Sequence, residues 1–453
     1  AVAEAGKPKA LKVKGEAAVV EQVLITPRGP IISPALVDPP LPGQANALSV
    51  SASFLQERPG TGLLAVHRAR SFAECHELFR AASTSATTVT YADVTGKIGW
   101  FLAVNVPRRK AGFGNLPLPG WREECGWQDE PVPFDQLPRV EDPAAGYLCT
   151  ANNQPAQDTE DTPFLGLDWL DGYRAARIGQ ALSARDDWDL RRTIGLQQDT
   201  TSLTWLEIRS WVLALRPAHP DAQLALGLLR RWDGTVSSRS VGASLYELTL
   251  AEVCQRITSA VAPKSMEWAR GKGFSPLLPY GLIITRRLGH VSRLLRQRPP
   301  GYFPSWEDQL EQCLAAAVST LRDRGGPDSG DWAWGQVRPL RLPHPFGGIK
   351  PLDRVFNLGP LPGVGDSGTI VQGTLDPADP LGNQISLPMV RAVFDVGRWD
   401  TCRFVLAGGQ SGNPFSPNYA DQLEPWASGQ GIQIGWSEAA AAERTVATMR
   451  LTP

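Results

Sequence analysis

The sequence predicts an α+β fold with a helical block between two strand-rich segments. Short runs of β-branched residues are frequent in residues 1–165, apolar residues at i, i+3 and i+4 dominate 166–330, and short apolar runs bounded by Gly and Pro return in 340–453. This order fits layered α+β folds better than a regular βαβ alternation, which would predict a parallel sheet. Because no internal repeat divides the chain, we expect one segment over 1–453.

Strands are predicted at four places in the first segment. Residues 17–26 are rich in β-branched types, and residues 47–54 alternate apolar and small polar side chains. Residues 87–93 and 96–104 are two apolar runs around a short turn that contains glycine. The second pair therefore predicts a β-hairpin.

Helices are predicted at five places. The first covers residues 71–82, where Ser71 is a suitable N-cap and Glu74 completes a capping box. The other four lie in the helical block and share apolar residues at helical spacing: residues 172–184, 204–215, 221–232 and 305–324.

Short strands with Gly and Pro between them are predicted again in the C-terminal segment. The candidate strands are residues 368–374, 389–396, 403–409 and 443–451. Forty-four glycines and 39 prolines are spread along the chain, which is typical of many short turns.

Charge and cysteine usage exclude several classes of function. Forty-five basic and 46 acidic residues give a net charge of −1, which argues against nucleic acid or an anionic membrane surface as a partner. The chain contains no run of 18 or more apolar residues, so no membrane span is predicted. Residues 1–15 contain no apolar signal core, so we expect any targeting peptide to have been removed or to lie elsewhere. The six cysteines lack zinc-site spacing, and one or two disulfides would fit an exported protein.

Several stretches resemble, in order, the β subunit of the penicillin amidase (penicillin acylase) family of N-terminal-nucleophile hydrolases. The similarity begins with VKGEAAVVEQVLITPRGPII and continues through YADVTGKIGWFLAVNVPRR to LPRVEDPAAGYLCTANNQP. It then runs through YRAARIGQAL, LQQDTTS, RRWDGTV, VGDSGTI and VRAVFDVGRWD to GGQSGNPFSPNYADQLEPW. No single motif is specific, but their shared order covers nearly the whole chain.

The resemblance implies a four-layer αββα fold and hydrolysis of an amide between an acyl group and an amine. In this family the nucleophile is an N-terminal serine or cysteine of the β subunit, exposed when a precursor cleaves itself. Its own α-amino group acts as general base, and such a group has an unperturbed pKa of about 7.7–8.0. The resemblance also implies an exported protein, located in the periplasm or outside the cell.

The chain departs from the family at its first residue, because Ala1 has no nucleophilic side chain. The similarity begins well inside the family's β subunit. Three explanations are open: further processing that leaves the nucleophile on another chain, a truncated fragment, or a relative without catalytic activity. We expect the first, with partner chains from the same precursor carrying an N-terminal Ser, Cys or Thr.

Asn152 corresponds to the family's oxyanion-hole asparagine, whose side-chain NH₂ donates to the developing oxyanion. Taken without the resemblance, an Asn-Asn pair is a turn signal, and Asn153 keeps that interpretation. Arg174 corresponds to a family arginine that orients this asparagine and holds acidic substrate groups. Arg177, one helical turn later, is the competing residue, and a salt bridge to a local aspartate is the structural alternative for either arginine.

Four further residues have weaker assignments. Trp169 is a candidate for the acyl pocket, and Asp161 for a structural calcium ion such as family members often bind; the chemistry itself requires no cofactor. Ser411 lies in a GxSxG-like stretch without strand-to-helix context, so we interpret it as structural. Asn418 stands where the family often has histidine, which argues against a proton relay there.

The predicted function is therefore hydrolysis of an acyl amide: a β-lactam, an acyl-homoserine lactone, or an N-acyl peptide or amine. The nucleophile is expected on a partner chain. The alternative is an inactive relative that serves as a binding or structural subunit.

Overall fold

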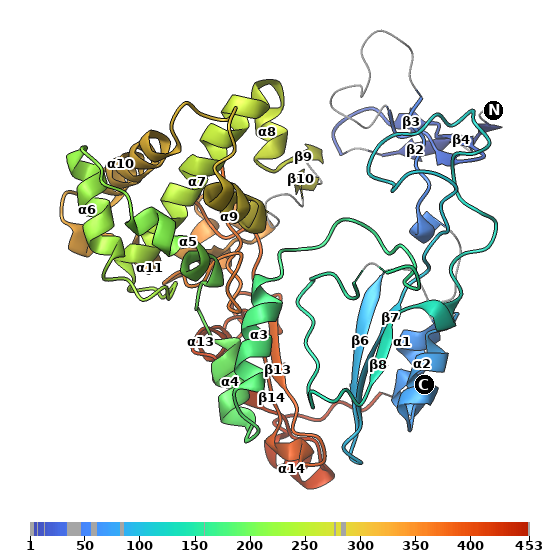
Figure 1. The fold of residues 1–453 in the computed structure, drawn as a ribbon. Coiled ribbons are helices and arrows are strands. Elements are labelled where there is room, and N and C mark those ends of the chain that lie inside the picture. The colour runs from blue at the N-terminus through green and yellow to red at the C-terminus, as the bar shows by residue number, and fades with distance from the viewer. Residues whose placement is uncertain are drawn as a thin grey trace. The chain divides into compact units, whose positions relative to one another are not determined.

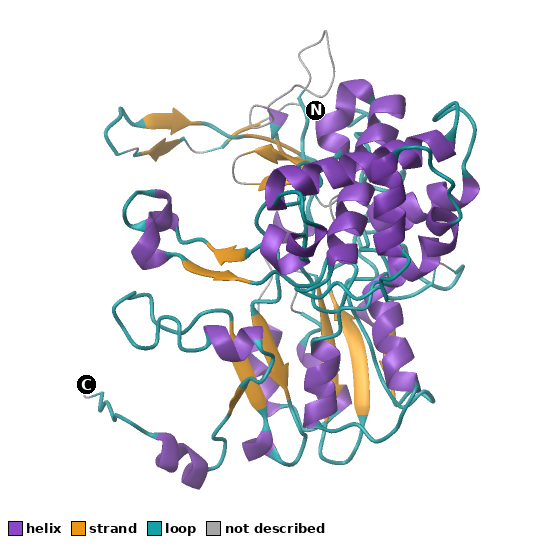
Figure 2. Cartoon of the chain, turned by 90° about the vertical axis from the view of Figure 1, so that its left-hand side faces the viewer, coloured by secondary structure: helices purple, strands orange, loops and turns teal. Residues whose placement is uncertain are grey.

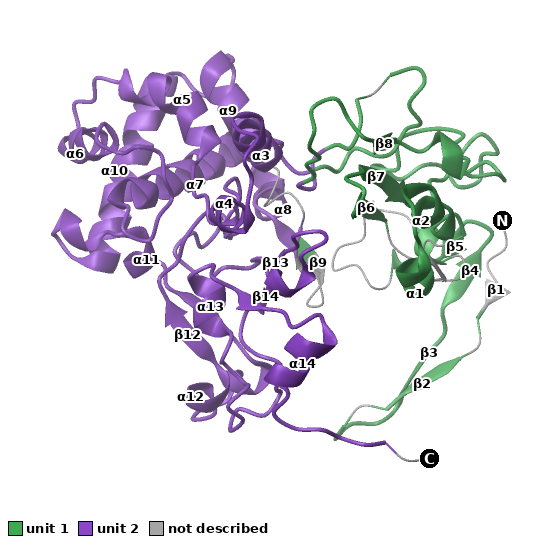
Figure 3. Cartoon of the chain, turned by 90° about the horizontal axis from the view of Figure 1, so that it is seen from below, with its two compact units in different colours: residues 1–150, 154–169, 273–279 green, residues 151–153, 170–272, 280–453 purple. Residues whose placement is uncertain are grey.

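A computed structural model describes residues 4–6, 8–12, 14–33, 47–55, 61–81, 86–157, 159–275, 278–281 and 287–451. The chain forms two compact units (Figure 3), and the single family segment expected over 1–453 stays a prediction. The first unit contains residues 1–150, 154–169 and 273–279, and the second contains 151–153, 170–272 and 280–453. Helices and small sheets of two or three strands occur together, which confirms the α+β class (Figure 2).

The first unit contains a three-stranded antiparallel sheet in the order β6-β7-β8 (Figure 1). β6 Thr87–Ala92 pairs with β7 Ile98–Ala103 from Thr87↔Ala103 to Ala92↔Ile98, which confirms the predicted hairpin. β8 Arg139–Glu141 pairs with the other edge of β7. Glycine is required at Gly99, since a Cβ there would lie 2.4 Å from the ring of Phe72.

The predicted strand over 17–26 is two strands with different partners. β3 Val19–Glu21 pairs with β2 Lys9–Leu11, and β4 Leu24–Thr26 pairs with β1 Glu4–Ala5 and β5 Gly29–Pro30. The strand predicted over 47–54 was wrong. Only an isolated bridge from Ile31 to Ser49 forms, and the chain then turns into a 3-10 helix, so the alternating pattern has no partner strand to extend along.

Two short helices belong to this unit, α1 Thr61–Ala65 and α2 Phe72–Leu78. The predicted cap is confirmed, because the Ser71 hydroxyl accepts from the Glu74 backbone N–H at 3.2 Å. The Glu74 carboxylate in turn accepts from the Arg70 N–H at 2.9 Å. The helix ends at Leu78, four residues before the predicted end, and packs its buried face, Phe72 and Cys75, toward β7.

The second unit contains the helical block, and the four predicted helices are confirmed within a few residues. Its helices are α3 Tyr173–Ser183, α4 Leu190–Gln197, α5 Leu203–Leu213, α6 Pro220–Leu229, α7 Val241–Val261, α8 Met266–Ala269, α9 Arg287–Gln297, α10 Trp306–Gly325 and α11 Trp334–Val337. α7 packs against α10 and α6 around a large apolar core (Figure 1). In the part of the chain that the structure describes, no helix is long and apolar enough to cross a membrane.

The C-terminal part of the second unit carries short strands and helices. β11 Leu340–Leu342 pairs with β12 Leu358–Leu361, and β13 Val390–Val393, β14 Arg403–Leu406 and β15 Ile432–Gln433 form a three-stranded sheet. The helices are α12 Asp353–Phe356, α13 Leu423–Ala427 and α14 Glu438–Arg444. A two-stranded ribbon of β9 Lys272–Ser275 and β10 Leu278–Tyr280 belongs mainly to the first unit, which contains residues 273–279.

Two of the predicted C-terminal strands form, as β13 and β14, and two do not. Residues 368–374 form no ladder, because their buried backbone groups find separate partners: Val371 N–H bonds the Asp199 carbonyl and Gly373 N–H that of Asp366. Residues 443–451 fail for another reason. Helix α14, capped by Ser437, takes the first two of them, and the rest are exposed without a neighbouring strand among the described residues. None of the six cysteines, all of them within the described ranges, forms a disulfide.

Candidate active site

Asn152 occupies a tight turn within the second unit. Its φ of 64° lies in the left-handed region, which asparagine tolerates better than most residues. The Asn152 carbonyl accepts from the Leu170 N–H at 3.0 Å, and the Asn153 side-chain oxygen accepts from the Ala151 N–H at 3.0 Å. These two bonds fix the backbone of residues 151–153. Asn153 thus makes the contact expected of a turn residue, while the Asn152 side chain is exposed.

Helix α3 begins at Tyr173, and hydrogen bonds connect its N-terminal end and the residue before its cap to two other helices. The Tyr173 hydroxyl donates to the Glu207 carboxylate on α5 at 2.5 Å, and the Asp171 carboxylate accepts from the Gly289 N–H on α9 at 3.1 Å. Burial and the neighbouring Glu207 raise the pKa of Tyr173, so its hydroxyl stays a donor at neutral pH. Arg174 is therefore carried by a rigid helix end.

Arg174 binds the side chain of Asn152. Its Nη2 donates to the Asn152 Oδ1 and to the Ala151 carbonyl, both at 2.8 Å. Because a guanidinium only donates, this contact identifies which atom of the amide is oxygen. The Nδ2 group is left as the free end, and no described residue accepts from it. The site therefore presents two oriented N–H donors at an exposed position.

Arg177, the competing residue, has a different partner. Its guanidinium donates to the Asp199 carboxylate from Nε at 3.0 Å and from Nη2 at 2.5 Å. Burial alone would raise the pKa of Asp199, but the hydrogen bonds from Arg177 and Thr201 outweigh it and hold the pKa below its usual value. The salt bridge is partly buried and belongs to the packing of this unit. Of the two arginines, the structure brings Arg174 to Asn152.

Trp169 lies in the first unit and lines a cavity of about 230 Å³ there. Its indole N–H donates to the Gly166 carbonyl at 3.2 Å. The cavity is also lined by Phe113 and Arg109, whose guanidinium lies 5.4 Å from the centre of the Phe164 ring. Burial lowers the pKa of Arg109. Sequence patterns did not single out Arg109, because it lies in a short basic run typical of a solvated loop.

Asp161, the calcium candidate, is exposed in the first unit. Calcium takes six to eight oxygen ligands, usually from several carboxylates. Within the described ranges no group of three or more His, Cys, Asp or Glu side chains is arranged to hold a metal ion. The residues described here do not assemble a calcium site around Asp161, and its role stays a prediction.

Ser411 and Asn418 lie together in the loop between β14 and α13. The Ser411 N–H donates to the Asn418 carbonyl at 3.0 Å, and its hydroxyl accepts from the Asn413 N–H at 3.1 Å. No strand enters and no helix leaves at Ser411, as a nucleophile elbow requires. The hydroxyl stabilises a turn, in keeping with the structural interpretation.

Comparison with known proteins decides the family. The family described as penicillin amidase matches residues 6–443, nearly the whole chain. The chain belongs to this family. Its relatives include penicillin acylase 2 proenzyme from Pseudomonas sp. (strain SE83), which is 29% identical over 98% of this chain and 55% of that protein. They also include acyl-homoserine lactone acylase QuiP from Pseudomonas aeruginosa, which is 27% identical over 93% of this chain and 54% of that protein.

This penicillin amidase family chain spans about half the length of the curated relatives it matches. Its fold is similar to that of a solved thermostable penicillin G acylase from Alcaligenes faecalis, with a TM-score of 0.66. That match covers 100% of this chain and 82% of the other, at 19% identity, and it supports the fold alone.

Proposed function

We propose that this chain is the C-terminal part of the β subunit of an acyl-amide hydrolase and that it supplies the oxyanion donor of the active site. The observation that carries the proposal is the Asn152 side chain, whose oxygen is held by Arg174 while its NH₂ is free and exposed. Donors that are oriented before the reaction stabilise the charge that develops on the carbonyl oxygen. The names of the relatives support acyl amides as the substrate class.

The remaining chemistry is assigned to a partner chain from the same precursor, which carries an N-terminal Ser, Cys or Thr. Attack by that nucleophile converts the substrate carbonyl into a tetrahedral intermediate, and its α-amine takes the proton. Asn152 Nδ2 donates to the resulting oxyanion. Arg174 keeps the amide from rotating, so it acts as a positioning residue. No step in this scheme uses a metal.

We further propose the assembly and location implied by the family. The fragments form an exported heteromer, produced from a self-cleaving zymogen, in which the four-layer αββα arrangement includes this chain. The word proenzyme in the name of one relative supports processing. Trp169 and its cavity are proposed to contribute to acyl binding, since aromatic walls suit an apolar acyl chain. The amine and acyl preferences, including β-lactam against acyl-homoserine lactone, are left to assay.

Replacing Asn152 in the assembled enzyme tests the proposal. Asn152→Asp keeps an oxygen for Arg174 but replaces the donating NH₂ with an acceptor, so the turn is kept while the oxyanion donor is lost. We expect kcat/KM on an acyl amide to fall about 10²–10³-fold or more, and Asn152→Ala to fall about 10²–10³-fold. Thermal unfolding serves as the control and should change little.

Full activity of Asn152→Asp would disprove the oxyanion assignment. No turnover by the wild-type assembly on a panel of β-lactam, acyl-homoserine lactone and N-acyl amine substrates would disprove the hydrolase proposal. That second result would favour the alternative, an inactive relative that binds acylated molecules.

A further inference from the structure

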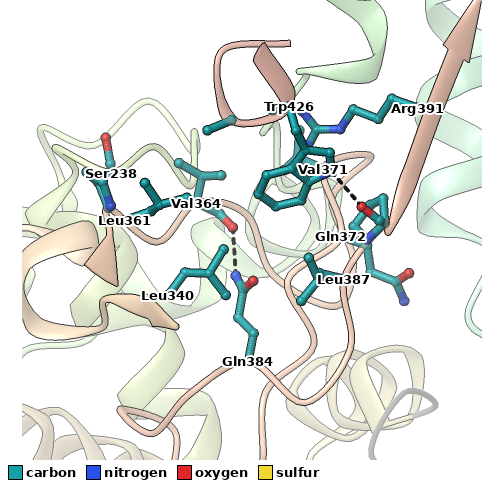
Figure 4. A pocket seen from close by; sticks show the side chains of 13 residues that line it. Ser238, Leu340, Leu361, Val364, Val371, Gln372, Gln384, Leu387, Arg391 and Trp426 are labelled. Atoms are coloured by element: carbon teal, nitrogen blue, oxygen red, sulfur yellow. Dashed lines mark hydrogen bonds between the residues drawn. The ribbon is translucent and has the colours of Figure 1, made fainter. Parts of the chain in front are cut away.

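The second unit contains a cavity of about 210 Å³ beside the β13–β14–β15 sheet (Figure 4). Its walls are mainly aliphatic, with Leu340, Leu361 and Leu387 among them, and these residues belong to a small apolar core. The volume is below the range of about 300–1,000 Å³ typical of drug-sized ligands. The cavity is therefore suited to a small, largely apolar molecule.

The polar groups that line the cavity are one cation and several neutral groups. Arg391 is the only charged residue among the thirteen that line it, and the neutral ones include Gln372 and Gln384. The Gln384 amide donates to the Val364 carbonyl at 3.2 Å, whereas no described residue bonds the Gln372 amide. Without an aspartate or glutamate in its lining, the cavity has a net positive character.

Arg391 is held in the interior by one tryptophan. Arg391 lies on β13, next to Ala392, and its side chain is 8% exposed. Its Nη1 donates to the Trp426 carbonyl at 2.6 Å. Its guanidinium also lies 4.8 Å from the centre of the Trp426 ring, and Figure 4 shows the two side chains together above the aliphatic wall. A carbonyl and a ring face do not neutralise a buried charge as a carboxylate does.

No described carboxylate pairs with Arg391. The guanidinium has five N–H donors, and one hydrogen bond to a described residue uses them. Burial lowers the pKa of Arg391 to about 10, so the group remains charged at neutral pH. A buried cation with unused donors at the wall of an apolar cavity matches the geometry of a bound carboxylate, which accepts two parallel N–H bonds from one guanidinium.

We propose that this cavity binds a small monocarboxylate with an apolar body. The carboxylate bonds the guanidinium of Arg391, and the apolar body packs on Leu340, Leu361 and Leu387. The site stands apart from the Asn152 turn in its residues and does not depend on the hydrolase proposal.

Binding of hexanoate and benzoate tests the proposal, with hexanamide and benzamide as neutral controls of the same shape. Isothermal titration and ligand-observed NMR on the whole chain should show both acids binding and both amides binding at least tenfold more weakly, because a charge-assisted pair is lost. Asn152→Ala should bind the acids as the wild type does, which separates this cavity from the oxyanion site.

Two variants locate the site. Arg391→Gln removes the charge and should weaken hexanoate binding about ten- to a hundred-fold. Arg391→Gln also removes the hydrogen bond to the Trp426 carbonyl, so a second variant is needed that leaves this bond in place. Ala427→Trp provides it: residue 427 is exposed and lines the cavity, so a large side chain there fills the cavity with little effect on folding. Arg403→Gln, on the neighbouring strand and outside the lining, is the matched control and should bind normally.

Equal binding of acid and amide would overturn the carboxylate assignment. Unchanged acid binding in both Arg391→Gln and Ala427→Trp would overturn the location. Absence of any binding of either acid at millimolar concentration to the folded wild type would overturn the site itself.

Discussion

Two polar clusters in the second unit use arginine differently. At the Asn152 site, Arg174 is half-buried, and the amide it holds is exposed. In what we call the Glu247 cluster, formed by Glu247 on α7, Arg287 on α9 and Asp366, all three side chains are buried. Glu247 is 1% exposed, and its Oε2 lies 3.9 Å from the Arg287 Nη2.

The two clusters differ in where their unused hydrogen-bonding groups point. Among the described residues, neither carboxylate oxygen of Glu247 has a hydrogen-bond partner, nor do Nε and Nη2 of Arg287. Burial, and then the charge of Asp366, raise the pKa of Glu247 well above its usual value against the opposing effect of Arg287. Unused groups in the interior lower stability, whereas an unused donor at the surface is available to a ligand. Accessibility therefore distinguishes a candidate site from a structural network.

The largest expected effect is on stability, at the Glu247 cluster. Glu247→Ala leaves a cavity in the packed interior beside Arg287, so we expect the free energy of unfolding to fall by about 2–5 kcal/mol in urea denaturation. Glu252→Ala is the matched control, since Glu252 lies on the same helix in a partly exposed pair with Arg256 and should cost under about 1 kcal/mol. Equal losses in the two variants would contradict this account of the cluster.

The next effect is on catalysis, at the Asn152 site. Arg174→Gln frees the Asn152 amide to rotate, so in the assembled enzyme we expect kcat to fall about 10- to 100-fold, with KM changed less. Arg174→Lys should recover part of the loss, because an ammonium also donates to Oδ1. Arg177→Gln, the matched control on the same helix, removes the Asp199 salt bridge and should affect stability more than rate. A larger loss of kcat in Arg177→Gln than in Arg174→Gln would reverse the assignment.

The smallest effect is a pH dependence that belongs to the Glu247 cluster alone. Because the pKa of Glu247 is raised in the folded state, the native protein holds a proton that the unfolded chain releases above about pH 4.3. The stability from this group is present below that pH and is lost as pH rises through the folded pKa, by up to about 1.4 kcal/mol per pH unit.

Glu247→Gln cannot ionise, so it measures that dependence. Relative to the wild type, the variant should gain stability as pH rises, in urea unfolding over a pH series. Parallel curves for the two proteins would show that Glu247 does not titrate in this window. Asn152→Asp, outside the cluster, should leave the slope of the wild type unchanged at neutral pH and above.

Local patterns predicted much of the secondary structure. The hairpin at 87–104 and the amphipathic helices α3, α5, α6 and α10 formed because their signal is contained in neighbouring residues. Helix α7 has no single apolar face, because most of its residues are buried and apolar residues occur all round it. Helical spacing of apolar residues therefore did not predict it. Residues 443–451 have the composition of a strand but no partner strand within the described ranges, and local sequence does not encode whether a partner is present.

The sequence by itself determined the family and the α+β class, and it singled out Asn152 and Arg174 as candidate site residues, because ordered motifs and short-range periodicity can be recognised without coordinates. The tertiary structure decided what these residues do to one another. A hydrogen bond from Arg174 to Asn152, 22 residues earlier, distinguishes Arg174 from Arg177. Asp366 of the VGDSGTI motif is buried in the Glu247 cluster. The tertiary structure also brought Arg391 against Trp426 beside a cavity. Contacts between distant residues depend on packing of the whole unit, and no local pattern records them.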